Sequence, residues 1–159
     1  MTDQTHSEDR YIVVGVDSSA GSRTALRWAL TQARLTGAAV EAVAAGRQPA
    51  TYDYSYGSVP FPSPGDSIAA TAEKVLSETV AEVAGTGDRP VDVRTRVARG
   101  PAAQVPLKAA TGAELLVVGS RGHGAFAGML LGSVSQHCAQ HASCPVVVIP
   151  DDEKSRTTP

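Results

Sequence analysis

The stretch "YIVVGVDSS" at residues 11–19 decides the fold class. Its unbroken apolar run predicts a strand that is covered on both faces, because a strand with one wet face would alternate apolar and polar residues. Residues 18–37 then predict an amphipathic helix that ends at a C-cap glycine, Gly37. The helix's apolar positions recur at three- and four-residue spacing: Ala25, Leu26, Ala29, Leu30 and Ala33.

The rest of the chain repeats this alternation of strand and helix. The order predicts an open parallel sheet with helices on both faces, an α/β fold. Strands are predicted at 38–45, 91–98, 113–119 and 145–150, and helices at 66–85, 101–112 and 132–142.

Finer expectations follow from the same patterns. The strand at 91–98 alternates apolar and polar residues and is expected to be half exposed, whereas 113–119 is the most apolar and is expected to be central. Pro101 is expected at the first helical position, with Pro106 still within the first turns. The helix at 66–85 is expected to face the core with Ile68, Ala72, Val75, Leu76, Val80 and Val83.

Length and composition indicate a single globular domain. A chain of 159 residues suits one domain at 11–150 between polar tails at 1–10 and 151–159. A net charge of −2 argues against nucleic acid as a partner, and no apolar run is long enough to span a bilayer. With no secretory signal pattern and only Cys138 and Cys144, we expect free thiols and a cytoplasmic protein.

The glycine-rich stretch "GSRGHGAFAGMLLGS" at 119–133 follows an aliphatic strand. Glycines let backbone N–H groups approach a ligand, and the helix that begins near Gly132 and Ser133 favours an anion, which Arg121 could also reach. In the alternative interpretation Ser133 and Gln136 form a capping box and the glycines only make a loop. The stretch is neither a G-x-x-x-x-G-K-[ST] phosphate loop nor a G-x-G-x-x-G motif.

The spacing Gly119-x-x-Gly122, nine residues, then Gly132-Ser133 resembles that of the nucleotide-binding branch of the universal stress protein family. The segments "VVGVDSS", "ARGPAAQVPLKAATGAELLVVGSRG" and "LLGSVSQHCAQHASCPVVVIP" carry the resemblance along nearly the whole chain. It implies a Rossmann-like five-stranded parallel sheet in the order 3-2-1-4-5. It also implies binding of an adenine nucleotide, with ATP and Mg²⁺ as the expected cofactors, and a homodimer formed along the last strand, residues 145–150.

The same resemblance assigns roles to single residues. It implies that Asp17 lies near the adenosine, in a turn with Gly15 and Val16, and that a backbone group of Ala45 contacts the adenine. The residues expected around the ribose and phosphates are Gly119, Arg121 and Gly122, followed at the phosphate tail by Gly132, Ser133, Val134 and Ser135.

The turn after the first strand departs from the family pattern. Many relatives have Asp-Gly-Ser where this chain has Asp17-Ser18-Ser19. Ser18 therefore costs backbone freedom if the turn needs a positive φ. Without the resemblance, Asp17 would be interpreted as a cap or turn residue before the following helix.

Two other groups of residues are candidate sites. His137 and His141 stand four residues apart with cysteines nearby, but Cys138 points roughly 100° away from His137 on a helix and no Cys-x-x-Cys pair exists, so no metal site is predicted. The loop at 46–65 is a lid or a partner-docking surface in one interpretation and disordered in the other. Its aromatic residues are Tyr52, Tyr54, Tyr56 and Phe61.

Three functions remain open from the sequence. The first is an ATP-dependent regulatory module of a stress response. The second is a slow ATPase or phosphotransferase, which needs metal ligands that the glycine-rich loop lacks, since Asp17 is expected at the other end of the nucleotide. The third is a nucleotide-free dimeric scaffold that acts through the tyrosine-rich loop. Trp28 is expected in the core, and His123 is expected in solvent.

Overall fold

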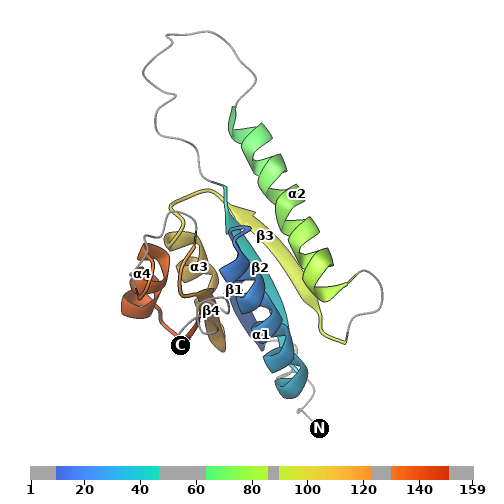
Figure 1. Cartoon of the computed structure of the whole chain (residues 1–159), viewed down its shortest axis with the longest axis vertical. Helices are drawn as coiled ribbons and strands as arrows, with labels where there is room; N and C mark the ends of the chain where they lie inside the picture. The colour runs from blue at the N-terminus through green and yellow to red at the C-terminus, as the bar shows by residue number, and fades with distance from the viewer. Residues whose placement is uncertain (1–9, 47–63, 86–89, 123–129, 151–159) are drawn as a thin grey trace, which may run out of the picture.

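Five parallel strands form one sheet in the order β3-β2-β1-β4-β5 in the computed structural model (Figure 1). This order confirms the expected fold. The structure describes residues 10–46, 64–85, 90–122 and 130–150. The strands are β1 (Tyr11–Gly15), β2 (Ala39–Ala45), β3 (Val93–Ala98), β4 (Leu115–Gly119) and β5 (Val146–Ile149).

The apolar run of β1 lies in the middle of the sheet. Ile12, Val13 and Val14 are fully buried, as expected for a strand covered on both faces. In the parallel register Val13 lies between Glu41 of β2 and Leu116 of β4. The expectation that 113–119 is central was one place off, because β4 lies between β1 and β5. The apolar content of a strand indicates that both of its faces are covered, which is true of β4 and of β1. It does not indicate the strand's position in the order of the sheet.

The helices are divided between the two faces, as predicted. Helices α1 (Ala20–Thr36) and α2 (Pro64–Ala84) pack on one face, and α3 (Gln104–Ala109) and α4 (Ser133–His141) pack on the other (Figure 1). Each face has its own apolar core, one around Ile12, Leu26 and Leu76 and the other around Val13 and Leu116. The middle of the sheet is therefore covered on both sides by helices, whereas β3 keeps exposed residues at 94–96.

Helix α1 confirms its predicted C-cap and inner face, and it begins two residues later than expected, at Ala20. The backbone of Gly37 is left-handed, with φ 79°, and its N–H donates to the carbonyl of Ala33 at 2.8 Å. Trp28 packs, partly buried, against the same core. The predicted apolar stripe is buried, with Leu30 partly so: Ala25, Leu26, Ala29, Leu30 and Ala33.

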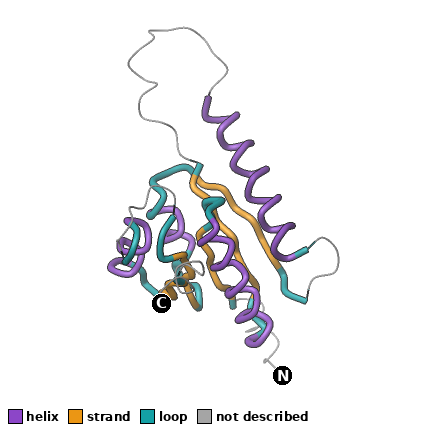
Figure 2. Tube along the Cα trace, in the orientation of Figure 1, coloured by secondary structure: helices purple, strands orange, loops and turns teal. Residues whose placement is uncertain are grey.

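Helix α2 begins two residues earlier than expected, at Pro64. Leu76 and Val80 are buried as predicted, but Val75 is 38% exposed. Thr79 is also buried, which was not expected of a polar residue. It can be buried because its hydroxyl donates to the carbonyl of Val75 at 2.8 Å. The first half of α2 reaches beyond the carboxyl ends of the strands (Figure 2).

Helix α3 is shorter than predicted. It begins at Gln104 and not at Pro101, whose carbonyl instead accepts from the Gln104 N–H at 3.0 Å in a preceding turn. Pro106 is the third residue of α3, where an N–H would have no acceptor within the helix. The buried Pro106 therefore costs the helix no hydrogen bond, as its position in the first turn predicted.

Candidate functional site

The candidate site lies where the carboxyl ends of β1 and β4 meet. The chain adds β2 and β3 on one side of β1 and then crosses to add β4 and β5 on the other, so the strand order reverses between β1 and β4. Ligands of open α/β sheets bind at such a switch point. The segments that leave these two strands are 16–19 and 120–122, which belong to the two motifs singled out in the sequence.

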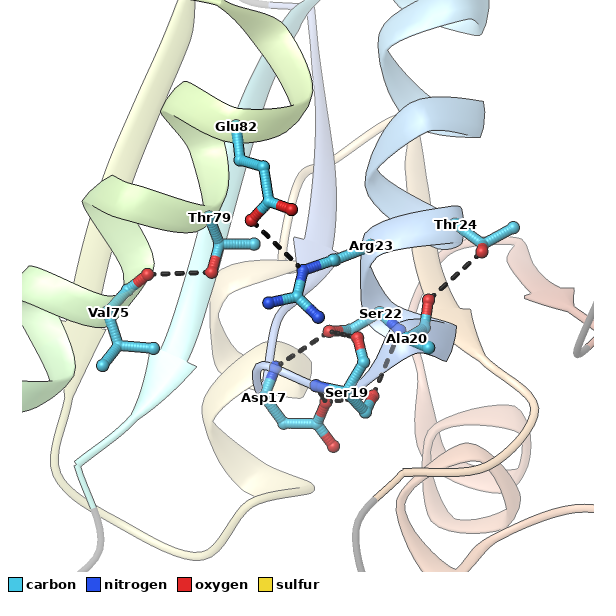
Figure 3. Close-up of polar contacts among 9 residues, drawn as sticks. All are labelled: Asp17, Ser19, Ala20, Ser22, Arg23, Thr24, Val75, Thr79 and Glu82. Carbon is cyan, nitrogen blue, oxygen red and sulfur yellow. Dashed lines mark hydrogen bonds and ion pairs between the residues drawn. The ribbon is translucent and has the colours of Figure 1, made fainter.

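The start of α1 is closed by a small hydrogen-bond network (Figure 3). Ser19 is the N-cap, and its side chain accepts from the Ser22 N–H at 3.2 Å. Asp17 Oδ1 accepts from the Ser19 N–H at 3.0 Å and from the Ser19 hydroxyl, while the Asp17 N–H donates to Ser22 Oγ at 3.3 Å. The capping role considered for Asp17 therefore belongs to Ser19, and Asp17 supports the cap while remaining exposed.

Ser18 has a positive φ of 66°, the only described residue other than glycine with one. The turn therefore does need the conformation that the Asp-Gly-Ser pattern favours. A left-handed conformation costs an L-residue with a Cβ roughly 1–2 kcal/mol. The strained residue, Ser18, lies in the segment that leaves β1 at the candidate site.

Gly119 and Gly21 let the end of β4 pack against the first turn of α1. A Cβ built on Gly119 would lie 2.9 Å from the carbonyl carbon of Gly21, and one built on Gly21 would lie 2.8 Å from the carbonyl oxygen of Arg121. Real Cβ atoms do not approach so closely, and backbone atoms cannot move aside cheaply. Gly119 is thus needed by the fold itself. Gly21 was missed from the sequence, although a glycine in the first turn of a helix is a usable signal of close packing.

Gly122 lies against the carboxylate of Asp17. A Cβ built on Gly122 would overlap Asp17 Oδ2. Asp17 was expected at the other end of the nucleotide from this loop. In the structure its carboxylate lies against Gly122, because the end of β1 and the end of β4 are neighbours in space. Asp17 and Gly122, 105 positions apart in the sequence, are direct neighbours.

The start of α4 has no side-chain cap. Gly132 is the N-cap with extended backbone, φ −76° and ψ 171°, and Ser133 is the first helical residue. The predicted Ser133–Gln136 capping box is wrong, since the Gln136 N–H donates to the carbonyl of Gly132 at 3.0 Å in the ordinary helical pattern. The N–H groups of the first turn, at 133–135, have no acceptor within the helix.

The two halves of the glycine pattern are joined through Ser120. Its carbonyl accepts from the Gly132 N–H at 2.7 Å and from the Ser135 hydroxyl at 3.0 Å, and that hydroxyl also lies 3.0 Å from the carbonyl of Gly132. Ser135 is 1% exposed, so its hydroxyl serves the protein interior. Ser120 acts through its backbone carbonyl, which any residue type has. The sequence therefore carries no signal that would have predicted this role.

The remaining site residues lie around this crevice. Val16 is buried and its N–H donates to the carbonyl of Val43 at 2.8 Å, while Gly15 pairs with Val43 in the sheet. Strand β2 continues two residues past Val43, so Ala45 stands at the rim above the end of β1. Arg121 is partly buried, and Val134 packs into the core beneath α4.

The histidine and cysteine cluster forms no metal site in the part of the chain that the structure describes. The rings of His137 and His141 contact each other at a tilt of 45° with centroids 4.5 Å apart, but no third His, Cys, Asp or Glu among the described residues joins a group that could hold a metal. Cys138 and Cys144 are free. Burial raises the pKa of the Cys138 thiol to about 11 and also raises the pKa of Cys144. His123 and the aromatic residues of the 46–65 loop lie outside the described residues.

Comparison with known proteins identifies the family. Residues 10–150 match the family model described as the universal stress protein family. The universal stress protein Rv2624c of Mycobacterium tuberculosis is 34% identical over 140 residues, covering 87% of this chain and 47% of that protein. The chain thus spans about half the length of the curated relatives it matches.

Solved structures agree with this assignment. UspA from Lactobacillus plantarum superposes with a TM-score of 0.69 at 25% identity, covering 89% of this chain and 98% of that one. A universal stress protein solved in complex with cAMP gives a TM-score of 0.53 at 26% identity, covering 88% and 95%. Among the described residues, no helix is both long and apolar enough to cross a membrane. On its sequence and its fold, this chain belongs to the universal stress protein family.

Proposed function

We propose that this protein binds ATP with Mg²⁺ at the carboxyl edge of β1 and β4 and acts as a nucleotide-dependent regulatory module in a stress response. One observation carries the proposal: the two halves of the glycine pattern, 119–122 and 132–133, lie in contact beside the uncapped start of α4. An uncapped helix start with glycines around it suits an anion. Family membership and the relative solved with cAMP, an adenine nucleotide, support the choice of ligand.

In this proposal the nucleotide lies along the crevice from Ala45 to α4. Gly15, Val16, Asp17 and Ala45 surround the adenosine, and Arg121 and Gly122 lie beside the ribose and phosphates. Gly119 contributes by holding β4 against α1 and not by touching the ligand. The phosphate tail accepts hydrogen bonds from the backbone N–H groups of Ser133 and Val134 at the start of α4. These two residues lie between Gly132, whose N–H is bound to the Ser120 carbonyl, and the buried Ser135.

Ser133→Glu tests the phosphate end without endangering the fold. The parent protein should melt at a higher temperature in excess Mg-ATP, because a ligand of the folded state adds about 2.7 kcal/mol at a hundred times its Kd. A carboxylate in the first helical turn interacts favourably with the helix dipole but repels a phosphate. Ser133→Glu should therefore keep the unliganded melting temperature and lose the stabilisation by ATP.

Gln140→Glu is the matched control. It adds the same charge to the same exposed helix about 10 Å from Ser133 and should bind ATP as the parent does. The proposal fails if millimolar Mg-ATP does not stabilise the folded parent, or if Ser133→Glu binds as tightly as Gln140→Glu. Gly122→Val is a poorer test, because its side chain would collide with Asp17 whether or not a ligand binds there.

A slow ATPase is the second candidate, and the position of Asp17 favours it. A carboxylate beside Gly122 is a suitable oxygen ligand for Mg²⁺ close to the phosphates. If Asp17 holds the metal, Asp17→Asn should abolish phosphate release in a single-turnover assay. Phosphate release that is absent in the parent, or equal in Asp17→Asn and the parent, would leave binding as the only function of the site.

We also propose a cytoplasmic homodimer that pairs through the last strand, residues 145–150. Strand β5 lies at the edge of the sheet and keeps partial exposure along Val146, Val147 and Val148. An unpaired edge strand can be satisfied by the same strand of a second copy. Light scattering at micromolar concentration should give the mass of a dimer for the parent and of a monomer for Val147→Pro. A monomeric parent would contradict the proposal.

A further inference from the structure

A groove opens on the α1/α2 face at the amino ends of the strands, far from the proposed nucleotide site. It lies between the second half of α1, the end of α2 and the start of β3, and it encloses about 280 Å³. Its lining combines apolar side chains with two arginines: Leu30, Val83, Val91, Val93, Arg27 and Arg34.

The side chains of the groove's two arginines have no anionic partner among the described residues. Helix α1 contains three arginines and no acidic residue, although the chain as a whole has a net charge of −2. Arg23 is paired, with its Nε 3.5 Å from Glu82 Oε2 of α2 (Figure 3). The side chains of Arg27 and Arg34 form no ion pair or hydrogen bond, and no carboxylate lines the groove within the described part of the chain.

The point at which α2 ends explains why Arg27 and Arg34 have no partner on that helix. Glu82 lies in the last turn of α2, which stops at Ala84. Arg27 and Arg34 follow Arg23 by one and three turns along α1. Helix α2 ends at Ala84, so no later turn of this helix runs alongside Arg34, and Val83 and Ala84 line the groove.

We propose that this groove binds a small amphipathic carboxylate, of which a medium-chain fatty acid such as octanoate is the model ligand. The arginines hold the carboxylate, since guanidinium matches its geometry, while the alkyl chain covers Leu30, Val83 and Val91. The groove's volume of about 280 Å³ lies just below the roughly 300–1,000 Å³ typical of small-molecule sites, which favours a small molecule over a peptide.

Calorimetric titration with octanoate tests the proposal. Octanoate should bind saturably, and both 1-octanol, which lacks the charge, and acetate, which lacks the chain, should bind much more weakly. Arg27→Gln and Arg34→Gln should each weaken octanoate binding about tenfold, the loss expected for one charge-assisted hydrogen bond. Both arginines are exposed, so the melting temperatures of these variants should match that of the parent.

Arg94→Gln is the control for loss of one arginine. Arg94 is exposed and forms an ion pair with the exposed Asp92, and it points to the other face of the sheet from Val93. The Arg94→Gln variant should leave octanoate binding unchanged. No saturable heat with millimolar octanoate, equal binding of 1-octanol, or undiminished binding to an Arg27→Gln/Arg34→Gln double variant would overturn the proposal. Ser133→Glu should still bind octanoate, so failure at the nucleotide site and failure at this groove are separable.

Discussion

Helices α1 and α4 both begin at the carboxyl edge of the sheet, yet their first turns are completed differently. At α1, Ser19 caps the helix, and its side chain accepts from the Ser22 N–H while Asp17 holds Ser19 in place. At α4, the N-cap is Gly132, which offers no side-chain acceptor. Neither first turn contains an acidic residue.

This difference bears on where an anion would bind. The start of α1 is completed by its own serines, so a phosphate there would have to displace the Ser19 cap. At α4 the first-turn N–H groups lack a side-chain acceptor, and the loop that reaches them contains Gly122 and Arg121. The helix start that is left incomplete by the protein is the one better suited to an external acceptor.

Gly119→Ala should have the largest effect, because it disturbs the packing of the end of β4 against the first turn of α1. Its Cβ would lie 2.9 Å from the carbonyl carbon of Gly21, and overpacking of this kind typically costs about 1–3 kcal/mol. Urea unfolding should show a loss near the upper end of that range. The control is Gly15→Ala at the corresponding end of β1, where the nearest atom, Val118 Cγ1, lies 3.5 Å away. Equal losses in the two variants would refute the close-packing explanation.

Ser19→Ala should have an intermediate effect, since it makes the start of α1 as incomplete as that of α4. Loss of an N-cap side chain costs about 1 kcal/mol. Thr24→Ala is the control, because its hydroxyl only bonds back to the carbonyl of Ala20 at 3.1 Å within the same helix. Thermal unfolding should separate the two variants, and a stability of Ser19→Ala equal to the parent's would show that Asp17 and Ser22 complete the turn without it.

Gly132→Ser should have the smallest effect on stability and makes the converse change at α4. A Cβ at this position meets only ordinary contacts, the closest at 3.5 Å from Arg121 Cα. A serine cap is better than glycine by a few tenths of a kcal/mol, so stability should rise slightly. Its hydroxyl would also occupy N–H groups proposed for the phosphates, and ATP affinity measured by calorimetry should fall. Tighter ATP binding by Gly132→Ser would contradict the idea that the uncapped start of α4 suits an external anion.

Much of the fold could be read from local patterns. The run at 11–17 predicted a doubly covered strand, and the spacing of Leu26 and Ala29 predicted the buried face of α1, because both signals depend on the period of a single element. The errors fell where neighbours in space decide. Val75 had the right spacing for burial but is 38% exposed, although the next residue, Leu76, is buried. Pro101 is a residue type that favours a helix start, but it lies in the turn before α3, which begins at Gln104.

The candidate site was predicted less completely than the fold. The residues of the glycine pattern were found from their spacing, and the concern about Ser18 was correct, because a positive φ leaves a recognisable preference for glycine in the sequence. The contacts of Asp17 with Gly122 and of Gly21 with Gly119 were not foreseen. Each joins segments about a hundred residues apart, and no periodicity connects them.

By itself, the sequence determined the alternation of strands and helices, the burial of β1 and the spacing of the glycines, because each is a property of residues close together in the chain. Only the tertiary structure decided what the glycines are for. Gly119 and Gly122 accommodate Gly21 and Asp17, whereas a side chain at Gly132 would meet only ordinary contacts. The reason is that β1 and β4 become neighbours only when the sheet forms, and the space left for a side chain depends on both.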